Sequence, residues 1–484
     1  MKPITVLVSG RFNVLHPGHL RLFRFAKECG DRLVVAVEND KLAGNLAHIN
    51  AQLRLEGVAS NSYVDEAILI DLPVVELIKA LRPNFVVKGK EHENQDNPEE
   101  KAVAEYGGKL LFSSGETTYS SLDLLRRELT SSITGTIQLA SAFMNRRKIE
   151  RARLLEICEK FKTLRVTVIG DLIIDEYITC EPLGMSQEDP SIVVTPIDSV
   201  RFVGGAGIVA AHAAGLGAEV DFISVSGLDS ARAFALRKLN DFKVSANILE
   251  DSSRPTTVKQ RYRAKGKSLL RVSHLRQGAI SAALQEQMLE LVKSVLPKAD
   301  LIVFSDFNYG VLPQSLVNQV IAIAKTFSVF IVADSQSSSQ VGDISRFTGI
   351  DLITPTEYEA RIYTRNYQDG LVVLAEKLRS QADVKNVLLK LGDEGLLIHA
   401  KDATEGSIEG GQIWTDQVPA LNLHPKDVAG AGDSLLVVSA MALTCKANIW
   451  EAACLGSLAA AIQVGRVGNT PLRIEELTRE IAEG

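Results

Sequence analysis

Two histidines stand three residues apart near the N-terminus, in the segment SGRFNVLHPGH at residues 9–19. Between them, Pro17 suits the first turn of a helix because it has no N–H to satisfy, and Gly18 lets a ligand approach the backbone closely. His16 and His19, at positions i and i+3, would then face the same side of the helix start. Anions are attracted to that end of a helix, and two imidazoles can stabilise the charge that develops when phosphorus is attacked. Each histidine alone could instead be a capping or surface residue. The presence of two, with Pro17 and Gly18 between them, favours a polyphosphate-binding site over that alternative.

A second glycine-rich turn lies in DVAGAGDSLL at residues 427–436, directly before an apolar helical segment. Gly430, Ala431 and Gly432 offer backbone N–H groups that can hold a phosphoryl group during its transfer. Asp433 follows at once, where it can accept the proton of an attacking hydroxyl. A tight turn in which Asp433 merely caps the helix is the alternative. The chain therefore shows two candidate phosphate-handling sites.

The composition sets limits on the class of protein. A length of 484 residues suggests two or three domains, and the hydrophobic and charged fractions of 46% and 23% are ordinary for a globular protein. The net charge of −6 gives no argument for nucleic acid or an anionic membrane as a partner. No apolar run approaches the ~20 residues of a membrane span, and the N-terminus reads as a strand and not as a secretory signal, so we expect a cytoplasmic protein. The five cysteines show no CxxC spacing, which favours reduced thiols over a disulfide framework or a zinc site.

The first part of the chain alternates strand-like and helix-like segments. Short apolar strands are predicted at residues 4–8, 32–37, 66–70, 85–88 and 109–112, with helical patterns at 19–29 and 73–81. Continuous apolar strands that alternate with helices imply a parallel sheet covered on both faces. We therefore predict a doubly wound α/β domain over residues 1–130.

Strand signals vanish after Ser131, and the charged segment 145–164 is predicted to form a helical connector, so a linker is assigned to residues 131–163. The alternation restarts at Arg165, with strands predicted at 165–171, 221–227, 301–307, 330–335, 351–356 and 387–392. Residues 190–205 and 256–275 alternate with period two, and we expect them to form antiparallel strands of a small β lid beside the main sheet. The predicted fold class is α/β, with two doubly wound parallel-sheet domains, the second over residues 164–484.

The first segment resembles the nucleotidyltransferases with an HxGH signature, in particular the cytidylyltransferase-like domains that make nucleotide-activated sugars and polyols. The resemblance rests on GRFNVLHPGH, GDRLVVAVENDK, RPNFVVKGKEHE and TTYSSLDLL, and covers nearly all of residues 4–128. It implies a Rossmann-like fold in which His16 and His19 contact a nucleoside triphosphate. It also implies nucleotide- or phosphate-binding roles for Gly10, Phe12, Asn13, Gly18, Arg54, Lys88, Ser120 and Ser121. Asn13 stands where the family has Asp, and Leu122 removes a hydroxyl from the family's serine-threonine run.

The remainder resembles the ribokinase-like (PfkB) sugar kinases over about residues 165–475, on VTVIGDLIIDEY, VRFVGGAGIVAAHAAGLGAEV, ITPTEYEA and LLKLGDEGLLI besides the glycine turn. Within them it is most similar to the kinase half of the bifunctional heptose kinase/nucleotidyltransferase family, in which the kinase comes first, whereas here the transferase does. The resemblance implies Asp433 as general base and residues 430–432 as the anion hole, with Lys390 and Gly392 also at the nucleotide. It implies that the sugar is bound by Asp171, Asp175, Gly204, Gly205, Lys259, Arg261, Arg271 and Asp306, and that Glu359 lies in the water shell of Mg²⁺.

The departures from this second family lie on the substrate side. Ile208 stands where the family has Asn, Tyr309 where Lys is expected, and Gln336 where an Asp-Pro-Lys turn has its Lys. Thr356 replaces the Asn of an Asn-x-x-Glu motif, and Ala429 replaces a Thr. Two accounts fit these changes: a changed sugar, or relaxed selection on a weak kinase.

Basic residues occupy alternate positions of the lid, at Lys259, Arg261, Arg263, Lys265 and Lys267, and on a strand these side chains share one face. Such a row suits a substrate that already bears a phosphate. A solvated lid surface is the alternative.

Two sites for consecutive reactions suggest one pathway. A kinase that uses ATP and Mg²⁺ would phosphorylate a heptose-like sugar phosphate at its anomeric hydroxyl. The transferase would then join the 1-phosphate to a nucleotide from ATP or CTP and release pyrophosphate. In the alternative, only the transferase is active, on a sugar or polyol phosphate, and the kinase-like half is a degenerate binding or scaffolding module. The expected partners are these small molecules and a second copy bound through the kinase lid, with no nucleic acid and no membrane.

Overall fold

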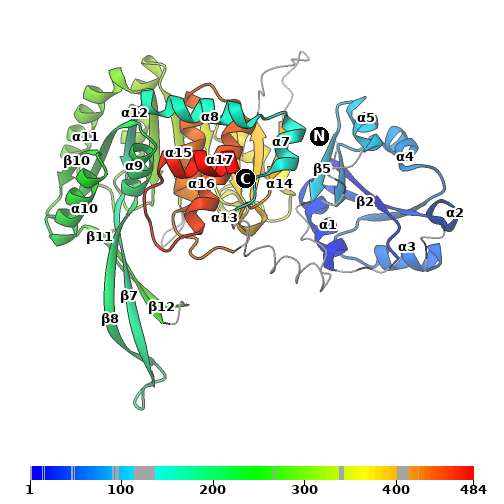
Figure 1. The fold of residues 1–484 in the computed structure, drawn as a ribbon, viewed down its shortest axis with the longest axis horizontal. Helices are drawn as coiled ribbons and strands as arrows, with labels where there is room; N and C mark the ends of the chain where they lie inside the picture. The colour runs from blue at the N-terminus through cyan, green and yellow to red at the C-terminus, as the bar shows by residue number, and fades with distance from the viewer. Residues whose placement is uncertain are drawn as a thin grey trace. The chain divides into compact units, whose positions relative to one another are not determined.

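The computed structural model describes residues 3–13, 15, 17–44, 47, 49–89, 92, 97–113, 137–264, 267–336, 343–400, 414–422 and 424–483. The chain divides into two compact units, the first formed mainly by residues 1–135 and the second mainly by residues 136–484 (Figure 1). Within the described residues, no helix is long and apolar enough to cross a membrane.

The first unit is built on a five-stranded sheet whose strands are all parallel, in the order β3-β2-β1-β4-β5. The strands are β1 (Thr5–Gly10), β2 (Arg32–Glu38), β3 (Glu66–Ile70), β4 (Phe85–Gly89) and β5 (Lys109–Ser113). The connecting helices are α1 (Pro17–Glu28), α2 (Asp40–Ala43), α3 (Ala51–Ala59), α4 (Val74–Leu81) and α5 (Pro98–Ala104). All five predicted strands are thus confirmed.

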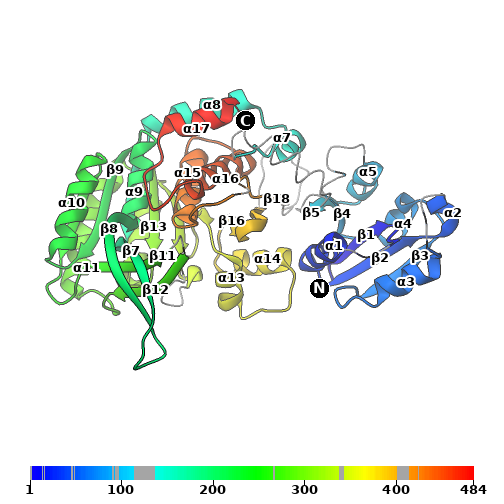
Figure 2. The same ribbon diagram turned by 60° about the horizontal axis from the view of Figure 1, so that its bottom comes forward.

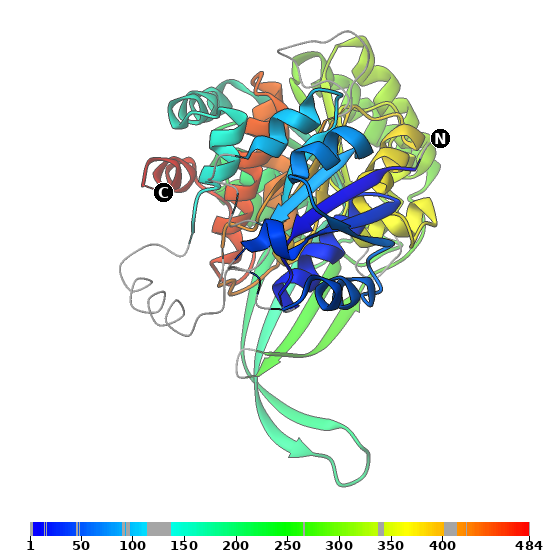
Figure 3. The same ribbon diagram turned by 90° about the vertical axis from the view of Figure 1, so that its right-hand side faces the viewer.

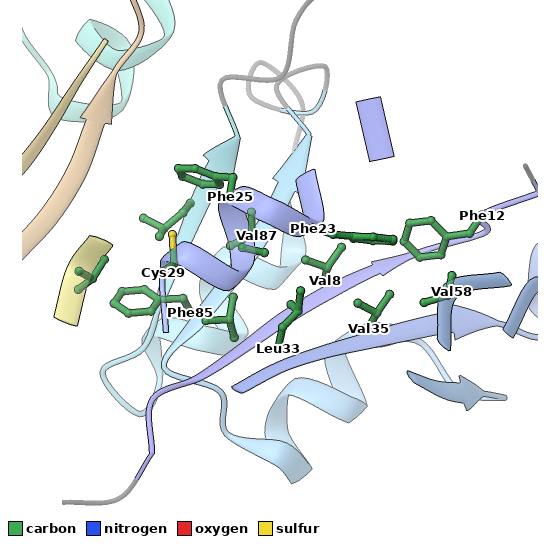
Figure 4. Close-up of a cluster of buried hydrophobic side chains, with 14 of the residues drawn as sticks. Val8, Phe12, Phe23, Phe25, Cys29, Leu33, Val35, Val58, Phe85 and Val87 are labelled. Carbon is green, nitrogen blue, oxygen red and sulfur yellow. The ribbon is translucent and has the colours of Figure 1, made fainter. Parts of the chain in front are cut away.

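Both faces of this sheet are buried, as the uninterrupted apolar strands predict. Alternate residues of β1 belong to hydrophobic clusters on opposite faces of the sheet. Val6 and Val8 pack with side chains of α1 and α3, whereas Leu7 packs with side chains of α4 and α5. Figure 4 shows the first cluster, in which phenylalanines of α1 meet valines of β1, β2 and β4. This two-sided core fixes the edge at which β1 and β4 end, where the first candidate site lies.

The second unit contains a nine-stranded sheet in the order β10-β9-β6-β13-β14-β15-β16-β17-β18. The strands are β6 (Arg165–Gly170), β9 (Glu219–Ser226), β10 (Ser245–Glu250), β13 (Leu301–Asp306), β14 (Phe330–Ser335), β15 (Leu352–Ile353), β16 (Asn386–Lys390), β17 (Leu396–Ala400) and β18 (Trp414–Val418). Pairing is parallel from β10 to β16 and antiparallel between β16 and β17. The six strands predicted for the main sheet are all present.

The helices that follow the first unit in the chain are α7 (Ser141–Arg147), α8 (Arg151–Lys160), α9 (Ala206–Gly215), α10 (Ser230–Asp241), α11 (Ala282–Val295), α12 (Gln314–Thr326), α13 (Glu357–Thr364), α14 (Leu371–Gln381), α15 (Ala431–Thr444), α16 (Ile449–Val464) and α17 (Ile474–Glu483). Helices α15 and α16 pack side by side and are buried on nearly all sides (Figure 2). Their sequences are apolar all round, as expected of interior helices. The start of α15 is therefore held rigidly beside the sheet.

The lid is a separate four-stranded sheet in the order β12-β11-β7-β8. It consists of β7 (Leu172–Met185), β8 (Ile192–Gly205), β11 (Thr257–Ala264) and β12 (Lys267–His274), and the β7–β8 hairpin projects beyond the rest of the second unit (Figure 3). The expectation of antiparallel strands holds for β7–β8 and β11–β12, but the central β11–β7 pair is parallel. Strand β7 escaped prediction because its first half is buried on both faces and shows no alternation.

The segment predicted as one connecting helix forms two helices instead. Helix α7 ends at Arg147, Lys148 adopts a left-handed conformation with φ of 54°, and α8 begins at Arg151. Phe143, Leu154 and Ile157 are buried, and α8 packs against α17. The break allows both helices to cover the second unit, while the domain limits assigned from the sequence remain predictions.

Two candidate phosphate-binding sites

The first candidate site lies where β1 and β4 end side by side. In the sheet, β1 has β2 and β3 on one side and β4 and β5 on the other, so the strand order reverses between β1 and β4. Ligands of open α/β sheets bind at such points. Gly10 ends β1, Asn13 follows, and Gly18 and His19 lie in the first turn of α1. His16, Ser120 and Ser121 lie outside the described residues, so their roles remain predictions.

Phe12 contributes to this site through its backbone. Its φ of 50° is unusual for a residue with a side chain and turns the chain between β1 and α1. The ring is buried, 5.3 Å from the ring of Phe23 and edge-on to His19 at 5.2 Å between centroids. The side chain therefore supports the imidazole of His19 from the core and leaves phosphate contact to main-chain groups.

Lys88 stands at the end of β4, and its ammonium is held by an acidic side chain. Lys88 Nζ lies 3.0 Å from Oε1 of Glu99, in the first turn of α5, and both side chains are largely buried. The second carboxylate oxygen, Oε2, is buried and accepts no hydrogen bond from the described residues. Glu99 was not predicted from the sequence, where it lies in an ordinary charged run.

The structure does not support a phosphate-binding role for Arg54, because its guanidinium is already used. Nε donates to the carbonyl of Ile49 at 2.8 Å, Nη1 to the carbonyl of Arg11 at 2.6 Å, and Nη2 to Oδ1 of Asp40 at 2.7 Å. The side chain is fully buried. Arg54 thus ties α3 to the loop after β1, and this assignment from the sequence is corrected.

The second candidate site is a cavity of about 310 Å³ at the carboxyl ends of the parallel strands of the second unit. It is lined by Ile173, Asp175, Gly205, Lys259, Arg261, Phe307, Gln336, Thr356, Glu359, Lys390, Val428, Ala429, Gly430, Gly432, Asp433 and Asn469. The predicted base, the glycine turn and part of the predicted sugar side are therefore brought together in one place.

Asp433 lies in the first turn of α15, directly after the glycine turn. Gly430 occupies the N-cap position with a φ of 78°, and no side chain caps the helix. N–H groups of the first turn can therefore bind an anion, apart from that of Ala431, which donates to the carbonyl of Val428 at 3.4 Å. Burial raises the pKa of Asp433 to about 7, with the carboxylate of Asp334 adding to the effect and the ammonium of Lys390 opposing it. A carboxylate with this proton affinity is suited to accept a proton from a hydroxyl near neutral pH.

Lys390 provides positive charge beside this turn. Its Nζ lies 3.0 and 2.9 Å from the two oxygens of Asp334, at the end of β14, which is separated from β16 in the sheet by the short strand β15. An ideal Cβ built on Gly432 would lie 3.2 Å from that Nζ, so the ammonium borders the turn itself. Burial opposes the charged form, but the carboxylates of Asp334 and Glu359 outweigh it and raise the pKa of Lys390.

Another part of the cavity lining combines a carboxylate, an amide and two cations. Asp175 Oδ2 accepts a hydrogen bond of 3.1 Å from Nδ2 of Asn469, and its Oδ1 lies 3.8 Å from Nη2 of Arg261. Lys259 Nζ lies 4.7 Å from the centre of the Phe307 ring and 5.1 Å from that of Tyr309, within the range of cation–π attraction. Burial raises the pKa of Asp175, and Arg261 and Lys259 oppose that shift.

Two aspartates predicted at the sugar lie behind the cavity wall. Asp171 Oδ2 accepts a hydrogen bond of 2.8 Å from the N–H of Phe307, and further N–H groups of the same loop point at both of its oxygens. Asp306 accepts from the hydroxyl of Ser335 at 3.0 Å and from the N–H of Asn308 at 3.1 Å. Neither residue lines the cavity, and the contacts of both position the loop that does.

The remaining predicted residues differ in their access to the cavity. Gly205 lines it, whereas Gly204 lies behind it, where a Cβ would come within 2.2 Å of Oδ2 of Asp175. Arg271 is exposed on β12, paired across the strands with Arg261. Gly392 has a φ of 64° in the turn after Lys390 and faces open space.

Glu359 lies at the cavity and fits an indirect contact with Mg²⁺. Its Oε2 accepts a hydrogen bond of 2.7 Å from the N–H of Thr356, which leaves less of the carboxylate for a metal. No group of three or more metal-ligating side chains occurs among the described residues. Because Mg²⁺ usually keeps several waters and takes one or two carboxylates besides phosphate oxygens, these residues are compatible with an ion that arrives with the nucleotide.

Comparison with known proteins gives two matches in the order in which the units occur. Residues 7–121 match the family described as cytidylyltransferase-like, and residues 163–475 match the pfkB family carbohydrate kinases. Among curated relatives, proteins called "Bifunctional protein HldE" align with 28% identity in Syntrophotalea carbinolica and 30% in Paramagnetospirillum magneticum. These alignments cover 69% and 68% of this chain and 66% and 65% of the relatives, so the chain spans slightly less than two thirds of their length.

Solved structures support the fold of the second unit. Phosphofructokinase-2 from Escherichia coli, in complex with substrates and products, has a TM-score of 0.54 at 18% identity over 66% of this chain and 98% of its own. Ribokinase from Thermotoga maritima has a TM-score of 0.51 at 21% identity over 66% of this chain and 100% of its own. At these identities the likeness establishes the ribokinase-like fold alone. The pfkB match covers more than half of this chain, and a cytidylyltransferase-like domain precedes it. The chain therefore belongs to the pfkB family of carbohydrate kinases.

Proposed function

We propose that the protein is a bifunctional enzyme of nucleotide-sugar synthesis. Its kinase unit phosphorylates a heptose-like sugar phosphate at the anomeric hydroxyl, and its transferase unit joins the resulting 1-phosphate to a nucleotide from ATP or CTP. The observation that carries the proposal is the cavity in which Asp433, the 430–432 turn, Lys390 and Asp175 converge. The relatives named as bifunctional proteins support the coupling of two activities in one chain.

In the kinase reaction, Asp433 accepts the proton of the sugar hydroxyl as that oxygen attacks the γ-phosphorus of ATP. The N–H groups of residues 430–432 and the ammonium of Lys390 hold the phosphoryl oxygens whose charge changes during transfer. Mg²⁺, when bound, would neutralise phosphate charge, with Glu359 reaching it through water. Asp175 and the cations Lys259 and Arg261 bind the sugar end, where they suit a substrate that already carries a phosphate.

In the transferase reaction, the sugar 1-phosphate attacks the α-phosphorus of the nucleoside triphosphate and pyrophosphate leaves. His16, His19 and Lys88 bind the triphosphate, and the helix start at Pro17 contributes its N–H groups. No covalent intermediate is needed, because a phosphate oxygen is itself the nucleophile. Ser120 and Ser121 are proposed to open a further phosphate-binding helix.

The alternative in which the kinase half has no activity is favoured by one contact. Gln336 stands in place of a lysine and bonds directly to Oδ1 of the proposed base, at 2.8 Å. A side chain that held Asp433 away from substrate would leave a module that binds nucleotide without transferring phosphate. The transferase would then act on a sugar or polyol phosphate made elsewhere.

The deciding experiment is mass spectrometry of products after incubation with ATP, CTP and a panel of sugar phosphates. A bisphosphorylated sugar and a nucleotide sugar are both expected from the wild type. Asp433→Asn should abolish the first product and keep ATP binding by calorimetry. His19→Ala should slow formation of the second by ~10²-fold, the scale of losing one transition-state donor, and leave the kinase unchanged. Binding of ATP by the wild type without any phosphorylated sugar would favour the alternative.

We also propose that two copies associate through the lid, inside the cytoplasm. The β7–β8 hairpin exposes large apolar side chains, namely Leu183, Met185, Ile192, Val193, Ile197 and Val200. Met185 and Ile192 pair directly across the two strands, so an apolar strip begins next to the turn of the hairpin. Exposed strips of this kind mark interaction sites. Light scattering should give a dimer for the wild type and a monomer for Met185→Glu combined with Ile197→Glu.

A further inference from the structure

Asn469 lies in the cavity wall between the sugar side and the glycine turn, in the loop between α16 and α17. It is 7% exposed, and its Nδ2 donates to Oδ2 of Asp175 at 3.1 Å. A carboxylate accepts hydrogen bonds, so the amide nitrogen must face Asp175 and the oxygen must face away. An ideal Cβ on Gly430 would lie only 2.4 Å from Oδ1 of Asn469, which places that oxygen against the turn.

Only one of the two polar atoms of this side chain has a hydrogen-bond partner among the described residues. Oδ1 of Asn469 is buried and accepts no hydrogen bond from any residue that the structure describes. A buried unpaired acceptor costs roughly 1–3 kcal/mol, so native structures contain few of them. An unpaired atom alone does not identify a site, but Asn469 also lines the cavity, and its Nδ2 lies beside the carboxylate of Asp175 there. The amide is therefore placed where it can contact a ligand.

The amide group can serve a ligand while it holds Asp175. An asparagine NH₂ carries two hydrogens, and the hydrogen bond to Asp175 uses one. A hydroxyl placed between the two residues can accept the second hydrogen and donate its own to the carboxylate. This donor–acceptor pair matches a sugar hydroxyl and does not match a methylene or an ether oxygen.

We propose that Asn469, together with Asp175, recognises one hydroxyl of the sugar and is a specificity-determining residue of the kinase unit. The proposal rests on the proposed function in that it takes a sugar phosphate as the ligand. A site whose polar groups are paired by a substrate hydroxyl rejects the analogue that lacks it, because burial then leaves those groups unpaired. The pair therefore determines which sugar is bound, whereas Asp433 and the glycine turn act on the transferred phosphoryl group.

The test measures sugar binding by calorimetry, without turnover. Hexose and heptose phosphates and their monodeoxy analogues are titrated into the full-length protein with a non-hydrolysable ATP analogue present. Asn469→Ala is expected to lower the affinity for the preferred sugar phosphate by ~10–100-fold and to leave the affinity for the ATP analogue unchanged. The wild type should bind one deoxy analogue more weakly than the parent sugar by a similar factor. Asn469→Ala should bind that analogue as well as the wild type does.

The matched control is Thr470→Val, which removes a neighbouring hydroxyl. Thr470 Oγ1 is likewise buried without a hydrogen-bond partner among the described residues, but Thr470 does not line the cavity. Its substitution should leave sugar affinity unchanged. Equal sugar affinity in Asn469→Ala and wild type, the same loss for every deoxy analogue, or no binding of any sugar phosphate by the wild type would each overturn the inference. Binding with the expected pattern but without phosphoryl transfer would uphold it and refute the kinase activity instead.

Discussion

The side-chain amide of Gln336 donates a hydrogen bond of 2.8 Å from Nε2 to Oδ1 of Asp433. The same nitrogen lies 3.3 Å from Oδ2 of Asp334, which in turn accepts from Lys390. The proposed base is therefore linked through one neutral amide to a buried ion pair. Because the amide donates to the carboxylate, it favours the ionised form and partly counters the burial that raises the pKa of Asp433 to about 7.

Substitution of Gln336 should shift the pH dependence of the kinase. Gln336→Leu removes a donor to the carboxylate, so the pKa of Asp433 rises and activity is lost at a higher pH as the solution is acidified. Gln336→Lys places a cation there, so the pKa falls and activity persists to lower pH. A hydrogen bond to a charged group contributes ~1.5–3 kcal/mol, which corresponds to roughly one to two pH units. The acid limb of kcat/KM against pH measures both shifts.

The transferase reaction of the same two variants provides the control, and its pH profile should match that of the wild type. Acid limbs that coincide in all three proteins would show that Gln336 does not contact the base during the reaction.

Two glycines with similar backbone conformations should respond differently to alanine. Gly430 has a φ of 78°, and a Cβ there would meet Oδ1 of Asn469 at 2.4 Å, whereas Gly392 has a φ of 64° and faces open space. Gly392→Ala should cost about 1 kcal/mol of unfolding free energy, from the left-handed conformation alone. Gly430→Ala should carry the same conformational cost and also displace the glycine turn, which should lower kinase kcat by more than tenfold. Urea unfolding and steady-state kinetics measure the two effects, and equal kinetics in both variants would contradict the prediction.

Glu99 is expected to position Lys88 for the transferase reaction. Glu99→Gln removes the charge that holds Lys88 Nζ at 3.0 Å, so the ammonium samples other positions and kcat/KM for the nucleoside triphosphate should fall about tenfold. Glu100→Gln is the matched control, since Glu100 is the exposed neighbour in the same helical turn. Kinase activity should be unaffected in both variants. The assignment fails if the two substitutions have the same effect on the transferase.

Arg54 should matter for stability and not for nucleotide affinity. Arg54→Met removes the hydrogen bonds to the carbonyls of Ile49 and Arg11, which should lower the unfolding free energy by about 2 kcal/mol or more. Arg32→Met is the comparison, because its ion pair with Glu66 is exposed and contributes little. A weaker affinity for the triphosphate in Arg54→Met, measured well below its melting temperature, would instead restore the phosphate-binding role.

The fold was largely predictable because the strands of parallel sheets are uninterrupted apolar runs. Strand β7 and the parallel β11–β7 pair were not, since burial on both faces removes the period-two alternation that marks a lid strand. The break at Lys148 was missed because a left-handed residue that is not glycine has no sequence signature.

The candidate sites were predictable where a motif joins neighbouring residues. His19 at its helix and Asp433 after its glycines follow from local sequence, and the cavity confirms that Asp433, Lys390 and Asp175 converge. Asn469, Glu99 and the bond between Gln336 and Asp433 depend on contacts between segments far apart in the chain. Arg54 was predicted at the site but has another role. The sequence near a phosphate motif does not reveal that backbone carbonyls already bind its guanidinium.

The order of the strands along the chain has a consequence for biosynthesis. Every strand of the first sheet has been made once Ser113 is complete, so this sheet can form while the ribosome is still at work. The buried helices α15 and α16 come near the end of the second unit, followed only by α17, and at roughly 5–20 residues per second they are made tens of seconds later. Until then the nascent second unit lacks the apolar helices that cover its sheet and exposes that surface. Chaperone dependence during translation should therefore fall on the kinase unit, and the transferase unit should emerge already folded.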